Sequence, residues 1–371
     1  MANPLLDLET CGQSVWLDYL SRALLDSGDL DRLIKNDHLK GLTSNPSIFE
    51  KAIAKTEDYD EEIHAFRKRS ITDPKAVYET IALNDIQSAC DHLRAVYEKT
   101  STDGFASLEV SPHLAFDTNK TIDEGLRLWH AVARPNLMIK VPGTTEGMAA
   151  IRRLISEGVN VNVTLLFSVK AYEDAANAYL HGLKDRLDRD LRIDTVHSVA
   201  SFFVSRIDSK VDRKLEQIIK GSKDSSAERL LGTIAIANAK VAYTRFQHIY
   251  QTDLAKHLLS NKANQQRLLW ASTSTKNPKY RDVLYVDSLI ANNTINTMPL
   301  ETLNKFRDHG KVNDLFMTNI HQEQKKLDSL ARLGLNFDAL CQELLQEGVQ
   351  LFIDAFDQLL ASIEKKLSDK T

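Results

Sequence analysis

Residues 136–167 read NLMIKVPGTTEGMAAIRRLISEGVNVNVTLLF, and this stretch decides the fold class. Two short apolar runs, 136–142 and 160–167, are rich in Val, Ile and Leu, which is typical of strands buried on both faces. Between them, residues 147–158 repeat apolar side chains at helical spacing, and glycine or proline stands where the two patterns change. The stretch therefore predicts a strand, a crossover helix and a second, parallel strand.

The same alternation runs through the rest of the chain. Apolar runs alternate with amphipathic stretches, which favours a parallel α/β fold; the runs are 14–20, 38–44, 107–112, 136–142, 160–167, 195–204, 267–272 and 283–289. An open, doubly wound sheet has the same pattern, but the phosphate motifs G-x-G-x-x-G and G-x-x-x-x-G-K-[ST] are missing. Because eight strands close a barrel, we predict an α/β fold of the (β/α)8 TIM-barrel type.

We expect residues 1–371 to form one barrel domain. Roughly 150 residues per domain would give two or three domains, but (β/α)8 barrels exceed that length as single units. The added length lies at about 205–265, where two helical patterns flank an expected exposed loop at 221–227. Residues 337–367 predict a final helix whose apolar face docks on the barrel, and Gly348 in its middle indicates either a break or close packing.

Composition excludes several classes of partner. With 47 basic and 51 acidic residues, the net charge of −4 gives no electrostatic basis for binding nucleic acid or an anionic membrane. No run of about 18 apolar residues occurs, so we expect no membrane span. The opening MANPLLDLET lacks the basic and apolar regions of a secretory signal, so we expect a cytoplasmic protein.

The chain also lacks the usual metal-binding spacings. Cys11, Cys90 and Cys341 are far apart and form no C-x-x-C pair, so neither a disulfide framework nor a zinc site is predicted, and the thiols are expected to be buried and reduced. The histidines show no H-E-x-x-H spacing, which predicts no metal site.

A lysine and two acids lie in apolar strands. Burial of Lys140 in LMIKVP favours a neutral amine able to attack a carbonyl. Alternatively, Lys140 has only a structural role and either pairs with a buried acid or extends its amine to the surface. Glu109 in SLEVSP can transfer protons or hold a water, or simply pair with Lys140. Asp18 in VWLDY is either a proton-transfer group or a helix cap.

Polar residues at other strand ends complete the candidate site. Asn160, Asn162 and Thr164 alternate with valines and share one strand face, which indicates a polar barrel interior or a hydrated helix interface. Asn45 follows the second strand in a turn of the type that Asn-Pro forms on its own. Hydroxyls and cations suited to a phosphate, or to an ordinary loop, follow the sixth and seventh strands: Ser201, Arg206, Ser272 and Lys276. Together these residue types describe an enzyme that forms a Schiff base with a phosphorylated carbonyl compound.

At these residues the chain resembles the transaldolases, in the longer bacterial subgroup and not the isomerase-fused form. The resemblance runs from about Ser14 to the C-terminal helix, and the segments that carry it are GLTSNPS (41–47), LEVSP (108–112), MIKVPGT (138–144), NVTLLFS (162–168), SVASFFVSRID (198–208) and LWAST (269–273). One segment departs: where many members have Ser-Phe-Arg after the seventh strand, this chain reads STSTKNPKY, so Lys276, together with Ser272, is expected to bind the phosphate.

The resemblance implies a role for each residue. Lys140 matches the Schiff-base lysine, Asp18 the acid that takes the sugar hydroxyl proton, and Glu109, with Thr164, the group that holds a water. Asn45, Asn162 and Ser201 match substrate-lining residues, and Arg206 matches the phosphate-binding arginine. The implied reaction transfers a dihydroxyacetone unit from sedoheptulose 7-phosphate or fructose 6-phosphate to glyceraldehyde 3-phosphate or erythrose 4-phosphate, without metal or organic cofactor.

Two alternatives remain open at the level of sequence. A fructose-6-phosphate aldolase-type lyase would share Lys140 but release free dihydroxyacetone, and a catalytically silent barrel would bind sugar phosphates without an imine. We expect sugar phosphates as partners and a monomer or homodimer. Whether the final helix covers the site, so that Phe352 or Phe356 contacts substrate, is also left open.

Overall fold

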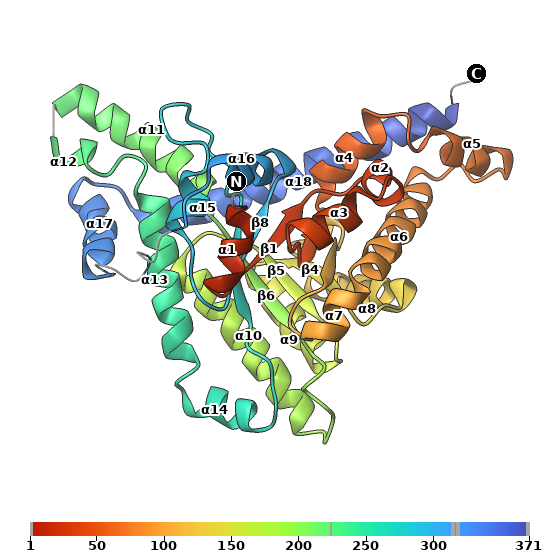
Figure 1. Cartoon of the computed structure of the whole chain (residues 1–371), viewed down its shortest axis with the longest axis horizontal. Helices are drawn as coiled ribbons and strands as arrows, with labels where there is room; N and C mark the ends of the chain where they lie inside the picture. The colour runs from red at the N-terminus through yellow and green to blue at the C-terminus, as the bar shows by residue number, and fades with distance from the viewer. Residues whose placement is uncertain (1–2, 223–224, 313–315, 317–319, 369–371) are drawn as a thin grey trace.

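The described residues form a closed barrel of eight parallel strands, which confirms the predicted fold (Figure 1). The computed structural model describes residues 3–222, 225–312, 316 and 320–368. Each strand is hydrogen-bonded to the next, and β8 returns to β1 with Gln13 opposite Thr294. The strands are β1 (Gln13–Asp18), β2 (Gly41–Thr43), β3 (Phe105–Glu109), β4 (Leu137–Pro142), β5 (Val161–Leu166), β6 (Ser198–Phe203), β7 (Arg267–Ala271) and β8 (Thr294–Met298).

One predicted strand is wrong. Residues 283–289 were expected to form the eighth strand, but Leu284–Ser288 form the short helix α15, and β8 lies further on in the sequence TINTM. Val283, Val286 and Leu289 are three residues apart and all buried, so the run fits one turn of helix as well as a strand. The true strand was missed because Thr294, Asn296 and Thr297 place polar side chains on both of its faces, and a search for apolar runs passes over it.

Helices surround the barrel as the alternating pattern predicts. Several begin at a side-chain cap, as at Asn45, Thr144 and Ser168, whose oxygens accept backbone N–H groups of the first turn. The helices up to β6 are α1 (Pro4–Thr10), α2 (Arg22–Asp26), α3 (Asp29–Asn36), α4 (Pro46–Ala54), α5 (Asp60–Lys68), α6 (Pro74–His92), α7 (Arg94–Thr100), the 3-10 turn η1 (Pro112–Leu114), α8 (Thr118–Val132), α9 (Thr145–Ser156) and α10 (Val169–Leu187).

The expected extra helical segment follows β6. It contains α11 (Ser205–Ser222), α12 (Ser225–Glu228), α13 (Ile234–Ile249) and α14 (Asp253–Ser260), and α16 (Leu300–His309), α17 (Ile320–Arg332) and α18 (Phe337–Ser368) complete the chain. The loop predicted at 221–227 is helical where the structure describes it: residues 221–222 belong to α11 and 225–227 to α12. Residues 223–224 lie outside the described part. Nowhere in the described ranges is a helix both long and apolar enough to cross a membrane.

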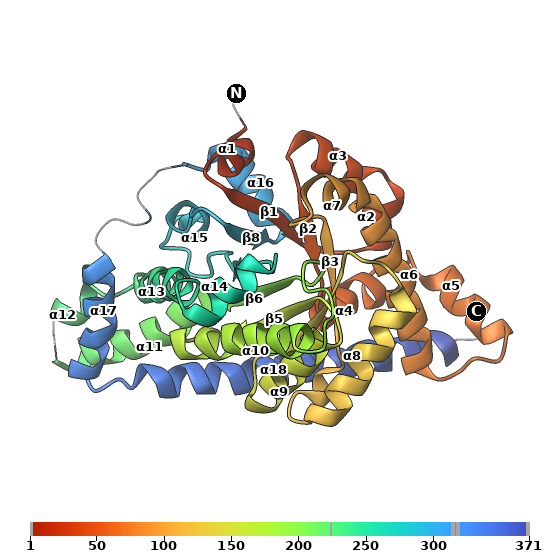
Figure 2. The same cartoon turned by 90° about the horizontal axis from the view of Figure 1, so that it is seen from below.

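The final helix, α18, crosses the end of the barrel at which the strands finish. Figure 2 shows it running the width of the molecule, from near α11 and α17 to α5, and it packs on α4, α6 and β5. Gly348 marks close packing, because α18 is continuous there and an added Cβ would lie 2.9 Å from Leu165 Cδ2. Phe352, one turn further on, is buried, so this helix forms a roof over the interior.

The three cysteines are free thiols, as expected. Cys90 and Cys341 are buried, whereas Cys11 is partly exposed at the end of α1, so the expectation of burial fails for that residue.

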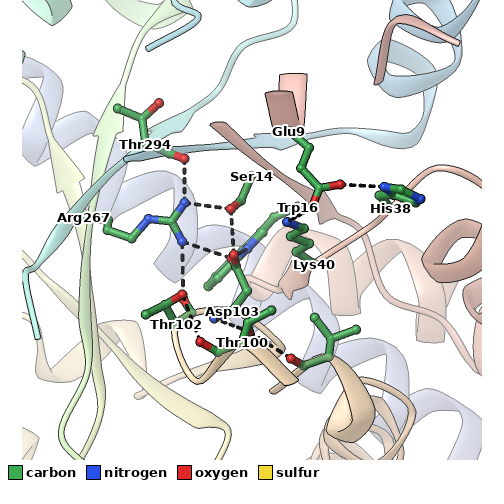
Figure 3. Close-up of polar contacts among 11 residues, drawn as sticks. Glu9, Ser14, Trp16, His38, Lys40, Thr100, Thr102, Asp103, Arg267 and Thr294 are labelled. Atoms are coloured by element: carbon green, nitrogen blue, oxygen red, sulfur yellow. Dashed lines mark hydrogen bonds and ion pairs between the residues drawn. The ribbon is translucent and has the colours of Figure 1, made fainter. Parts of the chain in front are cut away.

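The opposite end of the barrel, where the strands begin, is closed by a buried ion pair (Figure 3). Arg267 Nη1 lies 3.1 Å from Asp103 Oδ1, and both side chains are buried. Arg267 Nη2 also donates to the Ser14 hydroxyl and to the Thr294 carbonyl, and Asp103 accepts from Ser14 and from Trp16 Nε1 at 2.9 Å. This network joins β1, β7 and β8 to the chain entering β3, which ties the barrel closed.

Removing Asp103 should therefore destabilise the whole barrel. Asp103→Ala leaves Arg267 buried without its counter-ion, and such a change costs about 3–5 kcal/mol. The measurement is the free energy of unfolding in urea. Arg192→Ala is the matched control, because it breaks the exposed Arg192–Asp194 pair and should change stability by less than about 1 kcal/mol. A loss at Asp103 no larger than the control would contradict this role.

Candidate active site

A cavity of about 500 Å³ opens where the strands end, beneath α18. Its wall is built from residues of β1, β2 and β4 to β8, the first turns of α4, α11 and α16, and the loop after β7, with Phe352 of α18 above. Eight of the predicted site residues line it: Asp18, Asn45, Lys140, Thr164, Ser201, Arg206, Ser272 and Lys276. The active sites of (β/α)8 enzymes lie at this end of the barrel.

Lys140 lies inside the barrel, on β4. It is 4% exposed, so it does not reach for the surface. Its Nζ lies 3.2 Å from Glu109 Oε2 on the neighbouring β3, donates to the Ser44 carbonyl at 3.0 Å, and lies 5.7 Å from the centre of the Phe352 ring. The pairing that was one alternative for Lys140 is thus present, and it leaves the amine on the cavity wall, where a carbonyl carbon can reach it.

Glu109 lies behind Lys140 and not on the wall of the large cavity. Burial raises the pKa of Glu109, while the charge of Lys140 opposes that shift. Its carboxylate oxygens accept no hydrogen bond from other described groups beyond the Lys140 contact, and the residue lines a separate cavity of about 20 Å³. A space of that size holds about one water molecule. Glu109 is therefore placed to exchange a proton with Lys140 or with a water.

Asp18 is the last residue of β1 and lines the cavity. Ser21, not Asp18, caps the following helix α2, so the structural alternative for Asp18 fails. Its Oδ1 accepts a hydrogen bond from Thr43 Oγ1 at 2.7 Å, and Thr43 in turn lies 2.8 Å from Thr297 Oγ1 on β8. Burial raises the pKa of Asp18, while Lys140 and the Thr43 hydrogen bond act in the opposite sense. An acid held this way at the cavity is placed to exchange a proton with a bound substrate.

The polar face predicted on β5 divides into three levels along the barrel. Asn160 lies just before the strand and binds backbone groups, donating to the Leu137 carbonyl and accepting from His197 N, so it is structural. Asn162 lies deeper than the cavity wall, donates to Ser107 Oγ at 3.0 Å and accepts from Ser201 Oγ at 2.7 Å. Only the third level reaches the cavity.

At that level Thr164 lines the cavity, and its buried hydroxyl has no hydrogen-bond partner among the described residues. Thr164 follows Asn162 on β5, the strand that pairs with β4, whereas Glu109 lies on β3 on the other side of Lys140. Unpartnered oxygens therefore flank the amine on both sides. Asn45 caps α4 by accepting from Ile48 N at 3.1 Å, and it also lines the cavity.

Three cations, Arg206, Lys276 and Lys51, line the same cavity. Arg206 lies in the first turn of α11, 5.4 Å over the Phe203 ring, and Lys276 lies in the loop after β7, where Nζ donates to Ser274 Oγ at 2.6 Å. Burial lowers the pKa of Arg206 and of Lys276, and Arg206 and Lys51 lower that of Lys276 further. No described carboxylate forms an ion pair with any of these three cations, so the cluster suits a bound anion such as phosphate.

Among the residues of this wall that the sequence did not single out, Lys51 and Thr297 matter most. Lys51 lines the cavity from α4. The one feature of the sequence that could have pointed to it is its position shortly after the polar segment 43–46. Thr297 orients Thr43, and it was missed because it belongs to the strand that was assigned to the wrong residues.

Comparisons with known proteins agree with this geometry. The family model described as Transaldolase/Fructose-6-phosphate aldolase matches residues 15–363. The chain belongs to this family. A protein named Transaldolase from Trichodesmium erythraeum is 46% identical over 100% of this chain and 99% of its own. Transaldolase 2 from Nostoc sp. is 44% identical over 98% of both chains, and Transaldolase from Saccharopolyspora erythraea is 43% identical over 97% and 96%.

The transaldolase/fructose-6-phosphate aldolase family that the motifs indicated is thereby confirmed. The family description names a transferase and a lyase together, so membership alone does not distinguish between the two reactions. The residues that line the cavity bear on the choice between transferase and lyase, above all Asp18 at the end of β1.

Loss of the Thr43 hydroxyl should move the pH dependence of catalysis. The Thr43 hydrogen bond favours the ionised form of Asp18, so Thr43→Val raises the pKa of Asp18 further. If Asp18 must be ionised to accept a proton, the acidic limb of the kcat/KM profile shifts to higher pH. Thr244→Val, which removes a helix hydroxyl bonded to the Lys240 carbonyl, is the control and should leave the limb in place. A profile unchanged in Thr43→Val would contradict the role of Asp18.

Proposed function

We propose that this protein is a transaldolase that transfers a dihydroxyacetone unit through a Schiff base on Lys140. The donors are sedoheptulose 7-phosphate and fructose 6-phosphate, and the acceptors are glyceraldehyde 3-phosphate and erythrose 4-phosphate, in the cytoplasmic non-oxidative pentose phosphate pathway. The observation that carries the proposal is that a buried amine, the Asp18 carboxyl and a cation cluster without ion-pair partners line one cavity.

Imine formation uses the groups around Lys140. Its Nζ, as the free amine, attacks the C2 ketone of the donor, and the carbinolamine then loses its oxygen as water, leaving the protonated imine. Glu109, 3.2 Å from Nζ, takes and returns the protons of these steps through a water that it holds with Thr164. The Thr164 hydroxyl has no partner among the described residues, and Glu109 has none besides Lys140. Both observations support this role, because buried polar atoms otherwise find partners.

Carbon–carbon cleavage then needs a base at the donor's C4 hydroxyl. Asp18 takes that proton as the C3–C4 bond breaks, and the bonding pair moves into the protonated imine, which becomes an enamine on Lys140. The aldose phosphate leaves, and the enamine attacks the acceptor aldehyde while Asp18 returns the proton to the new hydroxyl. The protonated imine accepts the electrons, so the mechanism calls for no metal or organic cofactor.

Binding of the phosphate is assigned to the cation cluster. Arg206 supplies a planar fork, Lys276 a point charge, and Ser272 a hydroxyl at the start of the same loop. Asn45 and Ser201 line the intervening wall toward the sugar hydroxyls, and Asn162 acts from beneath by fixing Ser201. The described residues of one chain supply this whole set, so the proposal requires no partner subunit.

The alternative within the family is a fructose-6-phosphate aldolase that releases free dihydroxyacetone. It would use Lys140 in the same way but would let the enamine be protonated and hydrolysed. Two observations favour transfer. Asp18 occupies the base position, where the resemblance indicates a tyrosine in the aldolases, and α18 with Phe352 covers the cavity, which limits the access of water.

Product analysis distinguishes transfer from release. With fructose 6-phosphate and erythrose 4-phosphate, we expect sedoheptulose 7-phosphate and glyceraldehyde 3-phosphate in equal amounts, with little free dihydroxyacetone. Free dihydroxyacetone formed as fast as sedoheptulose 7-phosphate would overturn transfer in favour of the lyase.

Asp18→Asn should lower kcat by about 100-fold or more, because general base catalysis is worth that much. The substitution removes the base while keeping the shape of the side chain, so KM should change little. The measurement is steady-state transfer with fructose 6-phosphate and erythrose 4-phosphate. Asp357→Asn on the exposed face of α18 is the control and should retain activity. Full activity in Asp18→Asn would remove Asp18 from the mechanism.

A further inference from the structure

The loop between β7 and α15, residues 272–283, carries Ser272 and Lys276 to the anion end of the cavity. This is also the segment in which the chain departs from the family pattern, with Lys276 where an arginine is common. A lysine has a flexible stem and no bidentate fork, so the loop must supply the geometry that an arginine carries in its own side chain. What holds this loop in place therefore bears on substrate binding.

Two buried acids on α11 hold the second half of the loop. Tyr280 Oη donates to Asp212 Oδ2 at 2.8 Å, and Tyr285 Oη, just beyond the loop, donates to Asp208 Oδ2 at 3.0 Å. Asp208 and Asp212 are four residues apart, so they lie on the same face of α11. Both carboxylates are buried, where a hydrogen bond is stronger than in water.

The other oxygen of each acid is also engaged. Asp212 Oδ1 accepts from Gly232 N at 3.0 Å, and Asp208 Oδ1 accepts from Ala235 N at 2.7 Å, so each carboxylate joins three segments of the chain. The Tyr280 ring also packs directly on the backbone, because a Cβ on Gly232 would lie 2.6 Å from its Cζ. Tyr280 is thereby held on both its hydroxyl and its ring.

The first half of the loop is tied to the same helix. Ser205 begins α11, its N donates to the Ser272 carbonyl at 3.0 Å, and the two hydroxyls lie 2.9 Å apart. Arg206 is the next residue on α11. One helix thus carries Arg206 and holds both flanks of the loop that carries Lys276.

We propose that Asp212 and Tyr280 are positioning residues for the phosphate end of the substrate, acting through Lys276. Their hydrogen bond locks the loop onto α11 and so keeps the Lys276 ammonium beside the Arg206 guanidinium. The phosphate as ligand rests on the proposed function, whereas the contacts themselves do not. Loosening this bond lets Lys276 leave the cluster and weakens binding of the phosphate, while the chemistry at Lys140 and Asp18 continues.

The test compares Tyr280→Phe, Lys276→Ala and the double variant. Tyr280→Phe should raise KM for fructose 6-phosphate and the inhibition constant of inorganic phosphate by about five- to tenfold, the scale of one ordinary hydrogen bond, with kcat within about twofold. Lys276→Ala should raise both constants at least as much. In the double variant, the added effect of Tyr280→Phe should vanish, because the residue it positions is gone.

A control and a second variant keep the test decisive. Tyr243→Phe removes a tyrosine hydroxyl bonded at 2.9 Å to the Asn292 carbonyl, away from the loop, and should leave KM and phosphate inhibition unchanged. If Tyr280→Phe does not fold, Asp212→Asn takes its place in the same cycle. Unchanged constants, or effects of Tyr280→Phe and Lys276→Ala that multiply independently, would overturn the inference. Absence of transfer in the unaltered enzyme would instead overturn the proposed function.

Discussion

An amine buried inside a closed barrel is the constraint on which the rest of this structure depends. Lys140 is 4% exposed, and a charge in such a place needs partners, which are Glu109 at 3.2 Å and the Ser44 carbonyl. The strands beside β4 must therefore be polar on their inner faces, as Glu109, Asn162 and Thr164 are. The roof formed by α18 follows from the same need, because an amine that is to form an imine works best where bulk water is limited.

Stability and chemistry occupy opposite ends of the barrel. Where the strands begin, Arg267 and Asp103 bind each other within a buried network that ties β1, β7 and β8 together (Figure 3). Where the strands end, the Thr164 hydroxyl has no hydrogen-bond partner among the described residues, and Arg206 and Lys276 form no ion pair with a described carboxylate. Closing the first end firmly allows the second to keep the unsatisfied polar groups that a substrate will engage.

The local pattern of apolar residues predicted most of the strands and helices, and each wrong prediction has a physical cause. The unit from β4 to β5 was predictable, because buried parallel strands are apolar and their crossover helix is amphipathic. β8 was not, since polar residues stand on both of its faces, and the apolar run 283–289 resembles a strand instead. The site residues Lys140, Asp18 and Arg206 stood out as polar groups in apolar strands or at their ends. The bond between Asp212 and Tyr280 was invisible, because the two residues lie 68 positions apart and each alone is unremarkable.

The most direct test of the central claim is to trap the imine. The protein is incubated with fructose 6-phosphate, reduced with borohydride and digested, and the modified peptide is identified by mass spectrometry. We expect a three-carbon adduct on Lys140 alone. The adduct should be absent when borohydride is added without the sugar. An adduct on another lysine, or none in protein shown to be folded, would contradict it.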